Sequence, residues 1–471
     1  MAKSKSISRD FTEGRLSSNI VLFALPIMLT NILQVLYNLA DHVVVGRFST
    51  DTLALAAVGS TSALTSLVVN LLVGVSAGTG VAVAQSFGAK DKVAVSKTVH
   101  TSLVFAFLAG ITFMTIGLLI SKPALIAMGT KPELLSKATA YMRIICIGIP
   151  ASAVYNFSAA ALRSVGDSKT PLIILSSTGV INVIFNIIFV IAFNLSVDGV
   201  ALATIIAQYI SAITVVAVLI RRKGECYSLD IKKLSIDKNT LIRVLRFGVP
   251  AAIQTSLYSI SNVLVASAAN VFSTSDISAR TITGNIDSVI YNITGSYLHA
   301  TMTVTAQNYG ARKLDRAKKA TGICLFQVAA ISWGVAQLIL LVDVPIVRIF
   351  INESDPNKEL ILQKTCELLS LTMNTYFILG IAEALSGTLR GFGYSLTPTL
   401  LSVISICGTR ITWIYTAFET ERFHTLYGLS LAYPISWIIS ATAIGIAVSL
   451  VFKKHKAKPL HLEESNTANL A

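Results

Sequence analysis

Four polar side chains recur along one stretch of an otherwise apolar segment near the start of the chain. In Thr30–Asp41, TNILQVLYNLAD, they are Asn31, Gln34, Asn38 and Asp41. Their spacing places them on one side of a helix. Amide oxygens and a carboxylate are groups that can hold a proton or a small cation. Since a charged Asp facing lipid would cost roughly 2.5–3.5 kcal/mol, we interpret Asp41 as a cation- or proton-binding group in a wet cavity of a transporter. An Asp near the outer end of a span could instead simply meet bulk water.

The helices that must position this stripe follow from the composition of the chain. Of the 471 residues, 53% are apolar and only 13% are charged. Soluble globular proteins contain about 25% charged residues. Charge this scarce, gathered between long apolar runs, indicates an all-α polytopic membrane protein. The net charge of +14 then reflects basic residues at the ends of these runs, and nucleic-acid binding is excluded.

Twelve apolar segments are long enough to cross a bilayer as helices. They lie near residues 19–45, 54–84, 98–120, 139–163, 171–193, 199–220, 247–270, 278–305, 321–343, 366–390, 397–417 and 428–452. With the N-terminus inside, the cytoplasmic segments hold about three times as many Lys and Arg as the external ones. We therefore expect a plasma-membrane protein with both termini in the cytoplasm.

The two halves of the chain repeat the same landmarks in the same order. AQSFGAKDK at 84–92 recurs as AQNYGARKL at 306–314, and ALRSVGDSKTP at 161–171 recurs as TLRGFGYSLTP at 388–398. Because each half contains six spans, the halves should be related by a pseudo-two-fold axis along the membrane normal. This predicts a six-helix bundle over 1–220, a cytoplasmic linker over 221–246, a second bundle over 247–452 and a cytoplasmic tail over 453–471.

These motifs resemble a known family. NLADHVVVGRFSTDTLALAAVG in the first span, AQ-x-x-GA after the second and eighth spans, and LR-x-x-G-x-S-x-TP after the fourth and tenth are similar to the multidrug and toxic compound extrusion (MATE) family. The Asp in the first span is typical of its DinF-like branch. The resemblance implies a secondary antiporter, not an enzyme, which exports cationic or amphiphilic small molecules in exchange for H⁺ or Na⁺. It implies no cofactor besides the coupling ion, and we expect a monomer in the lipid bilayer.

The resemblance also implies partners for Asp41 in the fifth and sixth spans. Asn182 and Asn186 lie at i and i+4 in INVIFN, and Thr204 lies in ALATIIAQ. In the DinF-like branch the residue corresponding to Asn186 is commonly a second Asp, from which this chain departs. The two amides could alternatively form only interhelical hydrogen bonds, worth about 0.6 kcal/mol on average.

Pro26 interrupts the backbone hydrogen bonds of the first span, so it is either a hinge that moves when the cation binds or a static kink. Substrate contacts should come from a wide apolar surface with few polar groups, although each candidate could equally be packing. The candidates are Met28, Gln34, Tyr37, Asn38, Asn156, Gln208, Tyr258, Asp287, Tyr291, Asn292, Tyr376 and Glu383. Asp287 and Glu383 are the intramembrane acids of the second half.

Other classes of protein fit the sequence less well. A lipid-linked saccharide flippase of the same superfamily usually has a strongly cationic cavity, whereas the basic residues placed within spans are Arg143 and Arg410. A membrane enzyme would need clustered catalytic side chains, and a channel would need a re-entrant filter or an oligomeric pore. The five cysteines show no spacing that is typical of a disulfide framework or of a metal site, and no metal is expected.

Overall fold

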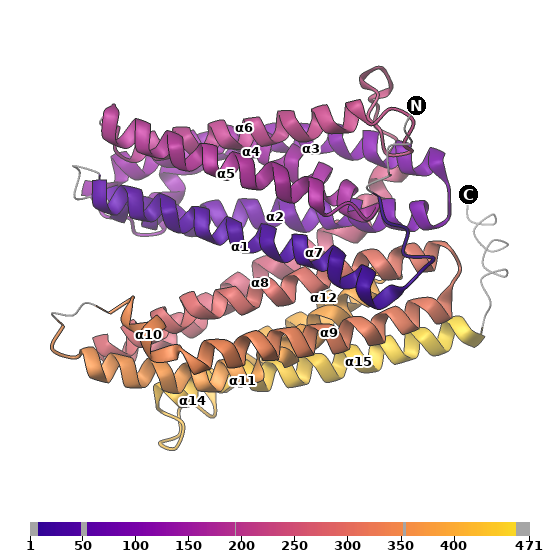
Figure 1. Ribbon diagram of the computed structural model, residues 1–471. Coiled ribbons are helices and arrows are strands. Elements are labelled where there is room, and N and C mark those ends of the chain that lie inside the picture. Colours follow the sequence, from indigo (N-terminus) through magenta and orange to yellow (C-terminus); the bar gives the residue numbers. More distant parts are fainter. Residues whose placement is uncertain (1–7, 49–53, 194, 352–354, 458–471) are drawn as a thin grey trace. The chain divides into compact units, whose positions relative to one another are not determined.

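A computed structural model describes residues 8–48, 54–193, 195–351 and 355–457, without the side chains of 38–40, 42–43, 45–55 and 62–63. Over these ranges the chain is helical, with turns between the helices (Figure 1). Large apolar side chains such as Leu119 and Phe326 are 72% and 75% exposed. Side chains of this kind on the outside of long helices are suited to lipid. The all-α membrane fold predicted from the sequence is confirmed.

The helices of the first half run alongside one another in Figure 1. Three of them contain an internal proline, and α5 continues into a π-helical turn, η1. Their bounds are α1 Leu16–Phe48, α2 Ala54–Gly88, α3 Lys92–Ala127, α4 Pro132–Ser164, α5 Lys169–Ile187, η1 Ile188–Ala192 and α6 Val197–Arg221.

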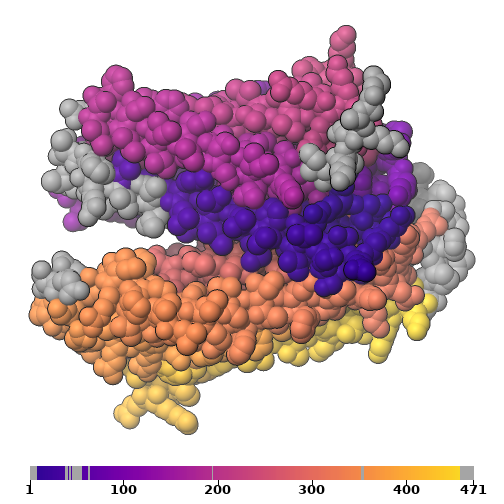
Figure 2. Space-filling view, in the orientation of Figure 1, coloured from indigo at the N-terminus to yellow at the C-terminus, as the bar shows by residue number. Residues whose placement is uncertain are grey.

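The second half repeats this series with more interruptions. A short 3-10 turn, η2, precedes α7, and the eleventh span is broken by a second π-helical turn, η4. The bounds are η2 Ile231–Lys233, α7 Lys238–Ala268, η3 Ala269–Val271, α8 Thr274–Gly310, α9 Leu314–Leu341, α10 Asp343–Arg348, α11 Lys358–Gly391, α12 Leu396–Ser402, η4 Val403–Gly408, α13 Thr409–Tyr415, α14 Leu426–Ser430 and α15 Ala432–Ala457. Figure 2 shows the turns between α13 and α14, in yellow, projecting from this half.

Ten of the described helical stretches are long and apolar enough to cross a membrane. The other two predicted spans correspond to α8 and to the broken series α12, η4 and α13. The polar residues along α8 and the short pieces of α12–α13 explain why a test of length and hydropathy passes over both. Together these elements make up the twelve-helix architecture.

The chain divides into two units whose borders fall inside helices. One unit comprises 1–10 and 25–252, and the other comprises 11–24 and 253–471. The borders therefore lie within α1 and within α7. Pro26 follows the first border directly, and Pro250 lies just before the second. We call these the N-terminal and the C-terminal unit.

The internal repeat is visible in the backbone. Lys90 and Arg312, which directly follow the two AQ-x-x-GA motifs, both adopt left-handed conformations, with φ of 61° and 58°. Gly166 and Gly393 occupy equivalent positions in the two LR-x-x-G motifs, with φ of 84° and 88°. A non-glycine residue with positive φ is uncommon. Two such pairs at matching sequence positions therefore indicate that both halves fold around the same turns.

Two glycines of α11 let this helix approach α8 closely in the C-terminal unit. In the C-terminal unit, a Cβ added to Gly391 of α11 would collide with Thr305 Oγ1 of α8, and would lie 2.9 Å from Met302 O. A Cβ at Gly387, one turn earlier, would meet the same helix. Close backbone approach through residues four apart is typical of membrane helix pairs. This close packing holds α8 in place, and α8 supplies many of the residues that line the cavity of the C-terminal unit described below.

The segment before α7 packs against the N-terminal unit. Tyr227 is buried, and its hydroxyl accepts a hydrogen bond from Arg222 Nη1 over 2.8 Å. Asp237 pairs with Lys97 of α3 over 2.9 Å and caps the start of α7 through Thr240. The hydrogen bonds from Thr240 and Lys97 lower the pKa of Asp237 to about 2. The last part of the predicted linker, from Lys238 onward, is the beginning of α7.

Candidate functional site

Four polar side chains from α1, α5 and α6, one of them Asp41, meet in the N-terminal unit. Asn186 of α5 donates a hydrogen bond from Nδ2 to Asp41 Oδ1 over 2.5 Å. Thr204 Oγ1 of α6 lies 3.5 Å from Asp41 Oδ2. Asn182 accepts from Asn186 Nδ2 at 3.2 Å, and its own Nδ2 lies 3.4 Å from Thr204 Oγ1. The structure thus brings together Asp41 and the three side chains that the sequence singled out beside it.

Local helical geometry aims these groups at one another. Asn182 and Asn186 are four residues apart in α5, so both side chains lie on one face of that helix. Thr204 Oγ1 donates to Val200 O within α6 over 2.9 Å. This distance is shorter than the 3.5 Å from Thr204 Oγ1 to Asp41 Oδ2, so the single hydroxyl proton is assigned to Val200 O. The oxygen lone pairs of Thr204 are then available to the cluster.

The cluster contains more acceptors than donors. The Oδ1 atom of Asn186 is buried and has no hydrogen-bond partner among the described atoms. No Lys or Arg of the described part of the chain lies within 4.0 Å of Asp41 to form an ion pair. An unsatisfied buried acceptor costs about 1–3 kcal/mol. A positively charged ligand on the carboxylate would have the unpaired amide oxygen of Asn186 as a further acceptor if that amide turned.

Sequence reasoning missed one neighbour of this cluster. Tyr141 of α4 interacts electrostatically with Asp41. It lies in a predicted span, but a tyrosine in an apolar run gives no signal that separates it from a packing residue. Tyr141 therefore lies near the cluster, without a hydrogen bond to it among the described residues, and the motif pattern did not indicate it.

The rest of the polar stripe in α1 does not join the cluster as a unit. Gln34 is exposed and Met28 is buried, whereas Tyr37 is half-buried and donates from its hydroxyl to Ser176 O of α5 over 3.1 Å. The side chain of Asn38 lies outside the described residues. Pro26 is inside α1, where its carbonyl accepts from Thr30 Oγ1 over 2.7 Å.

Two further candidates of the N-terminal unit make local contacts. Asn156 of α4 donates to Ser152 O one turn earlier over 2.8 Å. Gln208 of α6 packs against Gly148 of α4, and its buried Oε1 has no partner in the described part of the chain. Neither side chain contacts the Asp41 cluster through a hydrogen bond.

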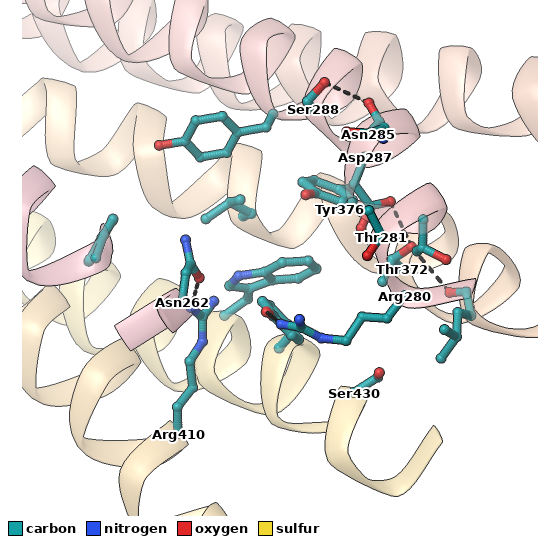
Figure 3. A pocket seen from close by; sticks show the side chains of 18 of the residues that line it. Asn262, Arg280, Thr281, Asn285, Asp287, Ser288, Thr372, Tyr376, Arg410 and Ser430 are labelled. Atoms are coloured by element: carbon teal, nitrogen blue, oxygen red, sulfur yellow. Dashed lines mark hydrogen bonds between the residues drawn. The ribbon is translucent and has the colours of Figure 1, made fainter. Parts of the chain in front are cut away.

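The C-terminal unit contains a cavity of about 420 Å³ (Figure 3). Four sequence candidates line it: Tyr258, Asp287, Tyr291 and Tyr376. Asp287 Oδ1 accepts a hydrogen bond from Thr372 Oγ1 of α11 over 2.9 Å. Figure 3 shows this pair on the same side of the cavity as Tyr376. The cavity thus brings three aromatic candidates and one acidic candidate together, and their role in substrate binding stays a prediction.

Two arginines of this cavity were not among the sequence candidates. Arg410 donates from Nη1 to Asn262 Oδ1 over 2.7 Å, as Figure 3 shows, and Arg280 lies near the start of α8. Arg410 could be recognised as an intramembrane basic residue, but Asn262 is distant in sequence. The π-helical turn η4 directly before α13 changes the helical register, so a period of 3.6 does not predict where Arg410 points.

The remaining candidates of the C-terminal unit lie apart from this cavity lining. Glu383 is buried in α11, where it interacts electrostatically with Arg390 two turns later. Arg390 also donates to Gln254 Oε1 over 2.8 Å. Asn292 donates to Ser288 O one turn earlier in α8 over 2.7 Å. Glu383 also interacts electrostatically with Tyr258 and Tyr291, which line the cavity, and the roles of Glu383 and Asn292 as substrate contacts stay predictions.

Comparisons with known proteins agree with this architecture. The family model MatE matches residues 26–188 and 250–416. The chain is 29% identical over 441 residues to the probable multidrug resistance protein YoeA of Bacillus subtilis, covering 92% of this chain and 93% of that protein. It is 25% identical over 404 residues to the probable multidrug resistance protein NorM of Thermotoga maritima, covering 83% of each.

Solved structures show the same fold. A MATE transporter of the MOP superfamily in an outward-facing conformation superposes with a TM-score of 0.87 at 20% identity, covering 97% of this chain and 100% of that one. A MATE structure in the straight conformation gives a TM-score of 0.86 at 20% identity over the same shares. At this identity the likeness concerns the fold alone.

Proposed function

The chain belongs to the MatE family and is a multidrug efflux transporter, and from this premise we propose that Asp41 binds the cation that drives export. The observation that carries the proposal is the convergence of Asp41 with Asn182, Asn186 and Thr204 from α5 and α6. The coupling ion is H⁺ or Na⁺. The Asp in the first helix supports assignment to the DinF-like branch of the family.

The chemistry of the cluster suits a monovalent cation. Asp41 supplies one negative charge, and Thr204 and the two amides supply neutral oxygens of the kind that bind hard cations. Asn186 has its nitrogen toward Asp41, but a half-turn of its amide would present an oxygen instead. Since no ion pair within 4.0 Å joins Asp41 to a Lys or Arg of the described residues, loading one cation neutralises the charge of the carboxylate. An ionisable residue at membrane depth is by default a candidate for such a role.

Pro26 is proposed as the hinge that transmits cation loading to the substrate path. It lies in α1 between the border of the two units and Asp41, so bending there moves the helix segment that carries the carboxylate. A proline removes one backbone hydrogen bond and lowers the resistance of a helix to bending. Loading would therefore shift α1 and close a cavity of the N-terminal half on the exported compound.

The exported compounds are proposed to be cationic or amphiphilic small molecules. Both termini would lie in the cytoplasm, since this orientation places most Lys and Arg on the inside. The segment 221–246 would be the cytoplasmic connection between a bundle over 1–220 and a bundle over 247–452, and the transporter would act as a monomer.

Efflux from vesicles with imposed gradients tests this function. Liposomes that contain the purified protein are loaded with a fluorescent cationic dye. Dye release is then followed under a pH gradient, under a Na⁺ gradient and without a gradient. We expect dye release to accelerate under one of the gradients. When a matching ionophore collapses that gradient, the rate of release should return to the rate measured without a gradient. Release that is insensitive to both gradients would contradict antiport.

A further inference from the structure

The cavity of the C-terminal unit holds two positive charges that contact the same side chain. Arg410 stacks on the ring of Tyr433, with its guanidinium carbon 4.3 Å from the ring centroid. Arg280 donates from Nη2 to the hydroxyl of Tyr433 over 3.3 Å. All three residues line the cavity, and Figure 3 shows the two guanidinium groups approaching it from α8 and α13. Two cations around one phenol form a concentrated positive region.

No carboxylate neutralises this pair within the described residues. Asp287 follows Arg280 on the same face of α8 but two turns later, about 10 Å along the helix axis. No ion pair within 4.0 Å joins Asp287 to Arg280 or Arg410 in the ranges that the structure describes. Arg410 is only 5% exposed, and its buried Nε has no hydrogen-bond partner among the described atoms. A buried charge without a counter-charge is costly, so the site favours an anion.

We propose that this cavity binds an aromatic organic anion, with the anionic group between Arg280 and Arg410. Guanidinium groups match the two oxygens of a carboxylate. Next to them, Tyr376 and Trp437 have ring centroids 4.7 Å apart, and Trp437 also contacts Tyr433 at 6.1 Å. These rings supply the apolar surface on which a ligand ring packs. The volume of about 420 Å³ lies within the range of small-molecule sites and suits a molecule of one or two rings.

This inference extends the proposed export function to a second class of ligand, and its binding step needs no gradient. The competing occupant is an aromatic cation held by Asp287. That occupant would leave the arginines unneutralised and would add a third positive charge to the cavity. The charges on the lining therefore favour the anion, and the two occupants are separable by experiment.

Three naphthalene probes that differ in charge test the proposal. Binding of 2-naphthoate, neutral 2-naphthamide and cationic 2-naphthylmethylammonium is measured by calorimetry on the full chain in nanodiscs of zwitterionic lipid. We expect naphthoate to bind about 10- to 100-fold more tightly than naphthamide, because charge-assisted hydrogen bonds are lost in the amide. Equal affinity for the two, or tighter binding of the cation, would overturn the proposal. Displacement of naphthoate by an added anionic lipid would also overturn it, since the occupant would then be a lipid headgroup.

Variants locate the binding to this cavity. Arg280→Gln and Arg410→Gln should each weaken naphthoate about 10-fold or more and leave naphthamide unchanged. Gly284→Leu should block all three probes, because Gly284 lines the cavity and has no neighbour within 4 Å of an added Cβ. Gly295→Leu is the matched control, since Gly295 lies on the same helix with similar space and outside the cavity lining.

The controls separate this proposal from the proposed function. Asp41→Asn should bind naphthoate as the wild type does, whatever its effect on export. Each variant is checked by thermal unfolding, and Arg280→Gln, at a half-buried position, keeps the test valid if Arg410→Gln unfolds. Unchanged naphthoate affinity in a folded Arg280→Gln or Gly284→Leu variant would contradict the assigned site.

Discussion

Replacing Asn186 by Leu removes both the donor to Asp41 and the one unpaired oxygen of the cluster. The donor lies 2.5 Å from the Asp41 carboxylate, and the oxygen is buried without a partner in the described part of the chain. A hydrogen bond to a charged group contributes about 1.5–3 kcal/mol. If Asn186 gives a comparable interaction to bound Na⁺, its loss corresponds to about a 10- to 100-fold weaker affinity. A proton, in contrast, would be held by the carboxylate alone.

The assay is dye efflux from liposomes as a function of external Na⁺ at constant pH, and of external pH without Na⁺. With Na⁺ as the coupling ion, Asn186→Leu should raise the half-saturating Na⁺ concentration about 10- to 100-fold. Asn156→Leu is the matched control, because within the described part of the chain Asn156 donates its hydrogen bonds to Ser152 of its own helix. An Asn186→Leu protein whose Na⁺-driven efflux saturates at the wild-type Na⁺ concentration would refute this account of the cluster.

Three further changes test the structure around the site. Gly391→Ala should destabilise the protein by about 1–3 kcal/mol in thermal unfolding, because the added Cβ meets α8. Gly322→Ala, where the added Cβ meets open space, should be neutral or should stabilise the protein by up to about 1 kcal/mol. A Gly391→Ala protein as stable as Gly322→Ala would argue against the close packing of α8 and α11. Pro26→Ala should slow gradient-driven efflux without loss of stability, whereas Pro123→Ala in α3 should leave the efflux rate unchanged. Equal efflux rates in the two variants would contradict the role of Pro26 as a hinge. Asp237, whose pKa is lowered from 3.8 to about 2, stabilises the fold above about pH 4 and loses this effect as the pH falls toward 2. The difference in melting temperature between wild type and Asp237→Asn should therefore shrink over that interval, and a difference independent of pH would contradict the contacts of the Asp237 carboxylate with Thr240 and Lys97.

Hydrophobic runs and turn motifs were sufficient to predict the twelve helices, because lipid requires long apolar segments and the turns repeat in both halves. The spans over α8 and over α12–α13, which are not among the ten long apolar helices of the structure, were predicted from their apolar runs in the sequence. Helical spacing could place Asn182 beside Asn186 on one face. It could not bring in Thr204, which came from the family resemblance, or Tyr141, whose place depends on packing.

The cavity of the C-terminal unit shows where sequence reasoning stops. Its aromatic candidates and Asp287 were named individually, but no local pattern joins Arg280, Arg410 and Tyr433, which come from α8, α13 and α15. The π-helical turn before Arg410 adds a register change that has no clear sequence signature. Counting the basic residues within the predicted spans therefore did not reveal that Arg280 and Arg410 line the same cavity.

Gradient-driven dye efflux by Asp41→Asn, measured beside the wild type in the same liposomes, tests the central claim most directly. The substitution keeps the size of the side chain and its ability to accept from Asn186, but removes the negative charge that would hold a cation. We predict that the variant folds, and that its efflux no longer responds to a pH or Na⁺ gradient. Efflux by Asp41→Asn that still follows the gradient at the wild-type rate would contradict the assignment of Asp41 as the coupling site.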